Sequence, residues 1–256
     1  RKSAIRIIPG CRLDLVDGPS LLAYPTNISA YSRLCNLLST GNLRAEKGDC
    51  HLYKADVYKH AKDMLFIVVP PTTLNREFDV EESFRQNLQE YQQILGDQLY
   101  IASCRYYNGD DAKYLYRIAQ LSTRFKVPMV ATNDVHYHHV IRRELHDIVT
   151  CIREKCTIYN AGFRLHANAE RCLKPQEEMF RLFRHYPEAI RHAEEIAEAC
   201  QFSLDELKYE YPEEIITEGR TPQEELTYLA WQGAKQLFGE VVPAKTIAAI
   251  NHELAF

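Results

Sequence analysis

A chain of 256 residues is long enough to bury one large core, or one domain with a smaller appendage. Hydrophobic residues make up 46% of the chain and charged residues 26%, which is typical of a globular protein and excludes a disordered one. The formal net charge of −4 excludes a global basic field for nucleic acid, and no apolar run approaches the roughly 20 residues of a membrane span.

The first fifty residues predict strands before the first helix. Apolar runs indicate a short strand at residues 5–8 and a hairpin between residues 11–15 and 21–24, with Asp-Gly in its turn. A helix is expected at residues 29–39, because its leucines recur on one face, and a polar loop at residues 41–50.

The middle of the chain alternates strands with helices. Buried strands are predicted at residues 65–69, 99–104 and 127–132, and helices at residues 81–95, 110–125 and 141–152. Continuous apolar strands separated by helices are typical of a mainly parallel sheet that is covered on both faces. The expected fold class is therefore α/β.

After Thr157 the strand-like runs disappear. Helices are predicted at residues 175–183, 187–200, 221–238 and 243–254. The run TPQE at residues 221–224 is a capping box with proline at the first helical position. Because residues 209–218 read as a polar, extended connector, we expect one domain over residues 1–203 and a helical extension over residues 204–256.

The run VPMVATNDVH at residues 127–136 is the main candidate for a functional site. An apolar strand leads directly into Asp134 and His136, and residues i and i+2 of a strand lie on the same face. Carboxylate and imidazole groups are ordinary ligands for Zn²⁺, Mn²⁺ or Fe²⁺. Active sites of barrels and open α/β sheets also lie at the carboxyl ends of strands. Asp134 and His136 are therefore the predicted metal ligands.

The eight cysteines have no CxxC spacing. Cys151 and Cys156, with His146 upstream, permit a zinc interpretation, but a second matching pair is missing. Free cysteines inside apolar runs behave as small hydrophobes, and a reducing, cytoplasmic compartment fits them.

A local basic cluster is the one sequence feature that could contact a nucleic-acid backbone. It contains Lys54, Lys59 and Lys62, with His51 and His60 between or beside them. Exposed lysines usually form a solvated face instead, so no nucleic-acid-binding residue is assigned.

Several collinear motifs resemble a known family. The run PMVATNDVHY at residues 128–137 is similar to the last metal-binding motif of the PHP (polymerase and histidinol phosphatase) domain. It looks like the version in the alpha subunit of bacterial DNA polymerase III, a C-family replicase. The runs RLDLVDGPSLL (12–22), RAEKGDCH (44–51) and TCIREKCT (150–157) resemble the error-prone, damage-tolerant branch. The resemblance covers nearly the whole chain.

The resemblance implies an incomplete PHP-type (β/α)7 barrel, followed by a helical extension that leads into the polymerase palm. The parent would be an error-prone DNA-directed DNA polymerase acting in damage-tolerant DNA synthesis and repair, with DNA as substrate and Mg²⁺ as cofactor. Its partners would include the sliding clamp and other damage-response polymerase components. Since the catalytic carboxylates of this family lie in the palm, the present segment is expected to be a non-catalytic scaffold that binds partners.

The metal site implied by the resemblance is degenerate in this sequence. The family's His-x-His entry strand would precede the first residue, Arg12 stands at an expected glutamate, and residues 70–71 and 102–103 replace further ligands. Asp134 and His136 remain as remnant ligands, and two ligands do not hold a catalytic metal against water. No cofactor is therefore expected on this segment. The alternatives are a metal-dependent PHP phosphoesterase and a purely structural pseudo-enzyme.

Overall fold

The computed structural model describes residues 5–208 and 219–255. The chain divides into two compact units, Arg1–Leu207 and Lys208–Phe256. The connector predicted at residues 209–218 lies outside the described residues. In the part of the chain that is described, none of the helices combines the length and the apolar character that crossing a membrane requires.

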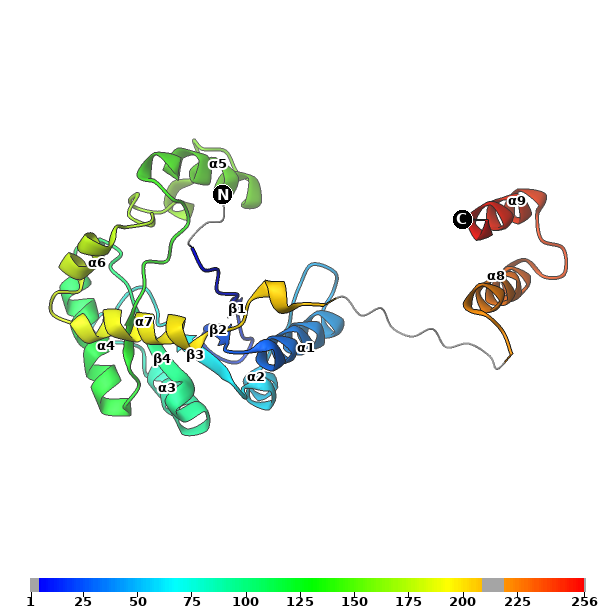
Figure 1. The fold of residues 1–256 in the computed structure, drawn as a ribbon. Helices are drawn as coiled ribbons and strands as arrows, with labels where there is room; N and C mark the ends of the chain where they lie inside the picture. The colour runs from blue at the N-terminus through cyan, green and yellow to red at the C-terminus, as the bar shows by residue number, and fades with distance from the viewer. Residues whose placement is uncertain (1–4, 209–218, 256) are drawn as a thin grey trace. The chain divides into compact units, whose positions relative to one another are not determined.

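One sheet with the strand order β1-β2-β3-β4-β5 organises the described part of the first unit (Figure 1). The strands are β1 (Cys11–Leu13), β2 (Leu21–Pro25), β3 (Met64–Val68), β4 (Leu99–Ser103) and β5 (Met129–Ala131). β1 and β2 form the predicted antiparallel hairpin, and β2 is also antiparallel to β3. Only the β3–β4 and β4–β5 pairs are parallel. The α/β class is confirmed, but the sheet is mixed, because β2 of the antiparallel hairpin pairs with β3.

The described helices are divided between the two units. The first unit contains α1 (Ile28–Arg44), α2 (Lys54–His60), α3 (Glu82–Leu95), α4 (Asp111–Phe125), α5 (Arg143–Arg153), α6 (Gln176–Leu182) and α7 (Pro187–Ala199). The second unit contains α8 (Pro222–Phe238) and α9 (Ala244–Leu254). The capping box predicted for α8 is present: the Glu224 amide donates to the Thr221 hydroxyl, and the Thr221 amide donates to the Glu224 carboxylate.

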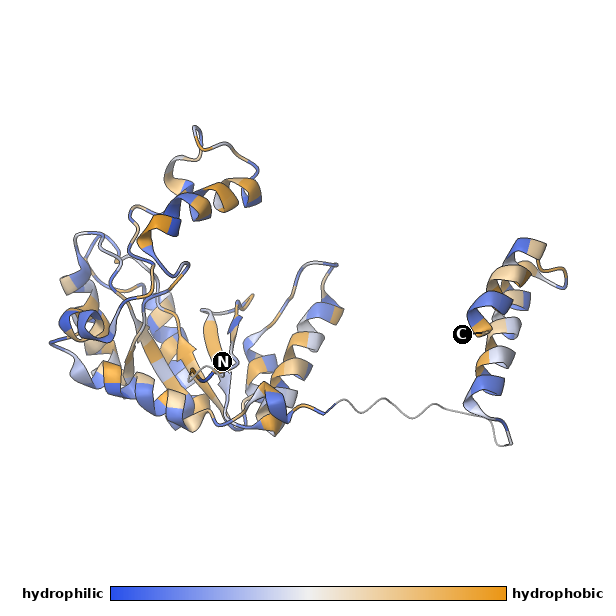
Figure 2. Ribbon diagram, turned by 45° about the horizontal axis from the view of Figure 1, so that its top comes forward, coloured by the Kyte–Doolittle hydropathy of each residue, from blue (hydrophilic) through white to orange (hydrophobic). Residues whose placement is uncertain are grey.

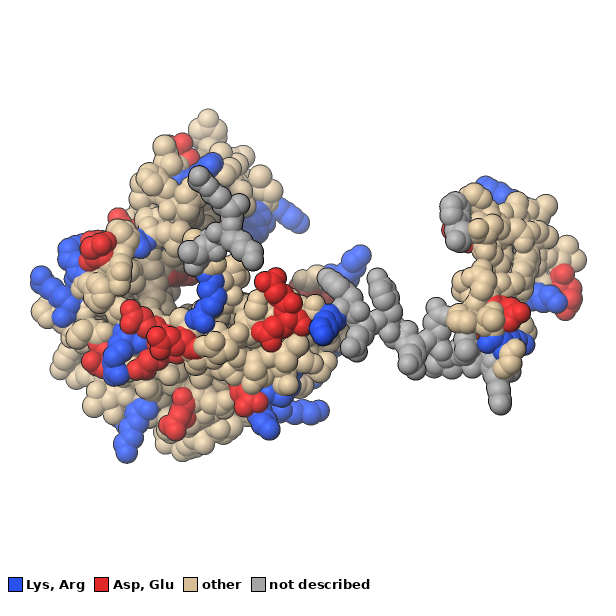
Figure 3. Space-filling view, viewed as in Figure 1, with Lys and Arg blue, Asp and Glu red and all other residues tan. Residues whose placement is uncertain are grey.

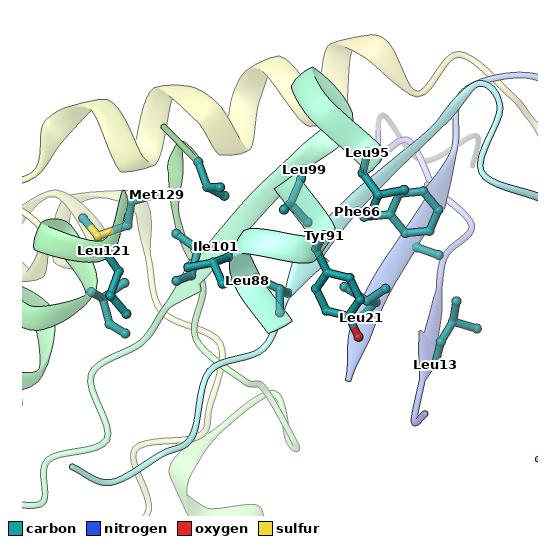
Figure 4. Packing of buried hydrophobic residues seen from close by; sticks show 14 of the residues in the cluster. Leu13, Leu21, Phe66, Leu88, Tyr91, Leu95, Leu99, Ile101, Leu121 and Met129 are labelled. Carbon is teal, nitrogen blue, oxygen red and sulfur yellow. The ribbon is translucent and has the colours of Figure 1, made fainter. Parts of the chain in front are cut away.

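Alternating side chains of the strands enter two hydrophobic clusters, one on each face of the sheet. Phe66 and Val68 point into the larger cluster with the inward faces of α1–α4, whereas Ile67 points to the opposite face. There it meets Val130 and Ile196 of α7. Figure 4 shows side chains of α3 packed against the larger cluster. Two-sided burial therefore explains why the strand sequences are continuously apolar.

Two predictions at the start of the chain are wrong. Residues 5–8 form no strand, and Ile5 and Ile7 are 80% and 74% exposed. α1 also continues past the expected loop start at residue 41. Gly41 is buried, and a Cβ at this position would lie 2.6 Å from Cys50 Sγ and 2.7 Å from Leu52. The absence of a side chain lets residues 50–52 pack against a helix that goes on to Arg44.

The helix expected behind the last strand lies elsewhere. α5 stands apart from the helices that cover the sheet, at the top of Figure 1, and hydrophobic residues recur along its surface in Figure 2. Leu145, Ile148 and Val149 are each more than half exposed, and Ile152 is 72% exposed. The residues between β5 and α5 carry the helix past the strand ends, so its apolar face does not join the sheet.

Shortening Leu88 tests the larger cluster. Leu88 of α3 is fully buried, so Leu88→Ala is expected to lower the free energy of unfolding by about 2–5 kcal/mol, since it removes buried methyl groups and leaves a cavity. Ile94 in the same helix is 51% exposed, so Ile94→Ala should lower it by less than about 1 kcal/mol. Urea unfolding followed by circular dichroism measures both, because the single tryptophan, Trp231, lies in the second unit. Equal losses in the two variants would contradict this packing.

Candidate functional site

The carboxyl ends of the parallel strands border a cavity of about 620 Å³. Its lining includes residues at which the family resemblance implies metal ligands: Arg12, Pro70, Pro71, Ala102 and Asp134. These residues lie far apart in the sequence and meet only because parallel strands end at the same edge of a sheet. Of these five, Asp134 alone has a metal-ligating side chain.

Asp134 and His136 lie close together, but not through the geometry of a strand. β5 ends at Ala131, and Asp134 has a φ of 40°, so the two-residue alternation of a strand does not reach the pair. Asp134 Oδ1 lies 3.6 Å from His136 Nε2. The pair therefore meets at a turn, and the predicted reason for its proximity is wrong.

Arg171 contacts both predicted ligands. Its Nη1 donates a hydrogen bond to Asp134 Oδ2 and lies 3.5 Å from His136 Nε2. A guanidinium stays protonated at any physiological pH, so a permanent positive charge occupies the place where the sequence predicts a metal cation. The Arg171 guanidinium carbon also lies 5.1 Å from the ring centroid of Tyr106, which adds a cation–π contact.

Backbone hydrogen bonds hold Arg171 in this position. The His136 amide donates to the Arg171 carbonyl at 2.9 Å, and the Leu173 amide donates to the Tyr137 carbonyl at 3.1 Å. Residues 136–137 and 171–173 thus run side by side. Arg171 was missed in the sequence because it lies 37 positions from Asp134, and no spacing rule links residues that meet through two loops.

A second arginine borders the same cavity. Arg12 Nε donates to Asp14 Oδ1 at 2.8 Å, and its Nη2 donates to Ser20 Oγ at 3.3 Å. A hydrogen bond from Ser20, and after it the guanidinium of Arg12, holds the pKa of Asp14 below its usual range against the effect of burial. Arg12 thus lies at the cavity, as predicted, with its charge paired to a neighbour.

His136 belongs to a cluster of three histidines, formed with His146 of α5 and His166. The ring centroid of His136 lies 5.0 Å from the ring centroid of His146 and 5.0 Å from that of His166. The rings of His146 and His166 are stacked, with 5.3 Å between their centroids. Burial is the first cause that lowers the pKa of each of the three imidazoles, and mutual repulsion lowers the pKa of His146 and His166 further. The sequence did not predict that His166 belongs to this cluster, because a loop brings it to the other two rings.

The other candidate ligands stay outside this cluster. Cys151 is buried and Cys156 is half-buried, but neither thiol joins a group of three metal-ligating side chains within the described residues. His138 and His139 are exposed. Ser103 stands at a position where the family resemblance implies a carboxylate ligand. Its hydroxyl donates a hydrogen bond to the Val130 carbonyl at 2.8 Å, so it has a structural role.

One lysine of the basic cluster, Lys54, is paired with a carboxylate. Lys54 Nζ lies 2.5 Å from Glu90 Oε2 and 3.1 Å from Asn87 Oδ1, which links α2 to α3. The hydrogen bond from Lys54 is the first cause that lowers the pKa of Glu90. Positive and negative side chains are interspersed on the face shown in Figure 3. The geometry therefore marks no nucleic-acid-binding residue on that face.

The first unit is thus an α/β domain with a cavity at the carboxyl ends of its parallel strands. The chain is 43% identical over 255 residues to an error-prone DNA polymerase of Caulobacter vibrioides, covering 99% of the chain. It is 42% identical over 258 residues to one of Brucella suis, and 40% identical over 255 residues to error-prone DNA polymerase 2 of Rhizobium meliloti. No family model matches the chain. The chain spans 23% of the length of each of these relatives and is homologous to one segment of the error-prone DNA polymerases, as the sequence motifs predict.

A double-mutant cycle between Arg171 and Asp134 tests the contact at the strand end. The side chains are 19% and 37% exposed, so Arg171→Met and Asp134→Asn should show a coupling energy of about 1–2 kcal/mol in urea unfolding. Arg153 and Glu154, 3.4 Å apart and 69% and 42% exposed, form the control pair, for which about 0.5 kcal/mol or less is expected. Coupling no larger than that of the control pair would mean that Arg171 does not stabilise this turn.

Proposed function

We propose that the chain is part of an error-prone DNA-directed DNA polymerase that synthesises DNA across damaged template. The observation that carries this proposal is the 40–43% identity, over 99–100% of the chain, to proteins of that name. In the longer protein, carboxylates outside this chain would hold Mg²⁺ at the growing primer end. Family resemblance adds the sliding clamp and other damage-response polymerase components as partners. The eight unpaired cysteines support a reducing, cytoplasmic compartment.

The domain assignment is part of the same proposal. Residues 1–203 would form a PHP-like domain, an incomplete (β/α)7 barrel, and residues 204–256 would connect it to the polymerase palm. The parallel order β3-β4-β5 and the cavity at the carboxyl ends of these strands support the first part. The compact unit that contains α8 and α9 supports the second.

Within this domain, we assign Asp134 and His136 the role of remnant ligands that no longer form a PHP metal centre. Arg171 supplies the positive charge that Asp134 requires, and Arg12 brings a second cation to the cavity. Pro70, Pro71 and Ala102 add no ligating side chain. A PHP phosphoesterase is therefore the less supported alternative, because its chemistry needs several ligands around each metal.

The segment would then act as a scaffold for the rest of the polymerase. The apolar face of α5, formed by Leu145, Ile148, Val149 and Ile152, is exposed in this chain. Exposed apolar faces of this kind are typical of interaction surfaces. The matched relatives extend far beyond the segment, so a further part of the same polypeptide is the occupant that we propose for this face.

Primer extension tests the proposed activity. The longer protein that contains this segment should extend a primed template past an abasic site in the presence of Mg²⁺ and deoxynucleotides. The 256-residue chain alone should extend no primer and hydrolyse no phosphomonoester, because the carboxylate pair for two-metal chemistry would lie outside it. A longer protein without nucleotide incorporation would contradict the polymerase assignment. Metal-dependent hydrolysis by the isolated chain would favour the phosphoesterase alternative.

Hydroxyl-radical footprinting of the longer protein tests the occupant of α5. Ile148 in α5 and Ile94 in α3 are 53% and 51% exposed in this segment. Because both are isoleucines, their intrinsic reactivity toward hydroxyl radicals is the same. If the rest of the polymerase covers α5, Ile148 should be labelled several-fold more slowly than Ile94. Equal labelling of the two isoleucines would show that this face stays open in the longer protein.

A further inference from the structure

Three histidine rings from three different segments meet beside the strand-end cavity. His136 follows β5, His146 lies within α5, and His166 belongs to the loop after α5. Each ring offers one nitrogen that lies within 4.8 Å of the others, and among the described residues no other group of three or more metal-ligating side chains meets at this spacing. Such a gathering of imidazoles needs a cause, because neutral histidines gain little from contacting one another.

We propose that His136, His146 and His166 form a binding site for one transition-metal ion of the zinc class. Imidazole nitrogen is a preferred ligand of Zn²⁺ and of its neighbours Co²⁺, Ni²⁺ and Cu²⁺. Three protein ligands leave a fourth position for water or another small ligand. A cavity of about 500 Å³, which His136 and His146 both line, provides room for that position.

Two buried polar atoms beside the cluster support the site. His146 Nδ1 and Asp147 Oδ1 are both buried and lack a hydrogen-bond partner among the described residues. The two atoms lie 4.0 Å apart. A carboxylate next to a ligating histidine is a common arrangement in metal sites, where it orients the ring and raises its basicity. A bound cation would offset the unfavourable burial of these two atoms.

Only small movements separate the present rings from metal-binding geometry. Three nitrogens that each lie 2.0–2.1 Å from one ion are roughly 3.4 Å apart, so the rings need to close by about 1 Å or somewhat more. The backbone already places the segments: Arg143 donates a hydrogen bond to the His166 carbonyl at 2.7 Å, and the His136 amide is bonded to the Arg171 carbonyl. Rotation of side chains in the two loop segments is sufficient for closure.

The arginines that act on the three rings are paired with carboxylates. Four arginines contribute to the electrostatics of the rings or contact them. Each is paired with a carboxylate: Arg171 with Asp134, Arg143 with Asp147, Arg153 with Glu154 and Arg12 with Asp14. Positive charge is thus compensated within the same region.

This site differs from the ligand set that the family resemblance implies. It shares His136 with that set, but Asp134 is engaged by Arg171, and His146 and His166 lie outside the family motif. The sequence predicts no cofactor on this segment, because that prediction considers only the ligands of the family motif. The proposed site departs from that prediction. A metal here would join α5 and the loop of His166 to the end of β5.

Metal titration of the purified chain tests this site. After treatment with a chelator, the protein is expected to take up one equivalent of Co²⁺, with the visible absorption of nitrogen-ligated cobalt, and Zn²⁺ should displace it. His146→Ala and His166→Ala should each weaken binding by about tenfold or more, because each removes one of three ligands. His51→Ala, at an exposed histidine that is outside the cluster and does not line its cavity, is the matched control and should bind as the wild type does.

Asp134→Asn distinguishes the histidine site from the remnant ligand pair. Unchanged binding in this variant supports the histidine site, whereas loss of binding in Asp134→Asn with retention in His146→Ala and His166→Ala would overturn it. Circular dichroism reports whether each variant folds. If a histidine variant does not fold, X-ray absorption at the zinc edge of the wild-type protein decides: three imidazole ligands support the proposal, and fewer overturn it. Absence of any uptake by the wild-type chain would also overturn it.

Discussion

Burial of the parallel strands on both faces is the constraint on which the rest of this structure depends. Successive side chains of a strand point to opposite faces, so Phe66 and Ile67 require covers on different sides of the sheet. The helices α1–α4 supply one cover, and α7 supplies the other. To reach that second face after β5, the chain must leave the sheet and return to it. This excursion contains α5, α6, Arg171 and the histidines.

The excursion also determines the electrostatics of the strand ends. Asp134 is half-buried at a turn with a positive φ, and a carboxylate in such a position needs a cation or several donors. Arg171 meets this need from a segment that returns along residues 136–137. Because a guanidinium carries its charge without any added ion, this edge of the sheet is held together by the polypeptide itself. Such an arrangement suits a scaffold better than a hydrolytic centre.

α5 and its surroundings differ from the sheet in how their side chains are buried and paired. The helix is amphipathic, yet its apolar face is exposed. Its polar side carries His146 and Asp147, each with a buried atom that has no hydrogen-bond partner in the described part of the chain. Both features indicate that this region gains its full stability from something beyond the contacts of the present chain. For the apolar face we propose a further protein surface, and for the polar side a cation.

The sequence by itself determined most of the elements, their class and the edge of the sheet at which the candidate site lies. Period-two and helical patterns depend only on residues that are close in the sequence. They therefore predicted the helices α3, α4 and α8 and the burial of Ile67 and Val130. The collinear motifs predicted the relatives. Only the tertiary structure decided how β2 pairs, that residues 5–8 form no strand, and that Arg171, His146 and His166 join Asp134 and His136. These outcomes depend on contacts between residues that are distant in sequence, and no local periodicity encodes which loops will meet.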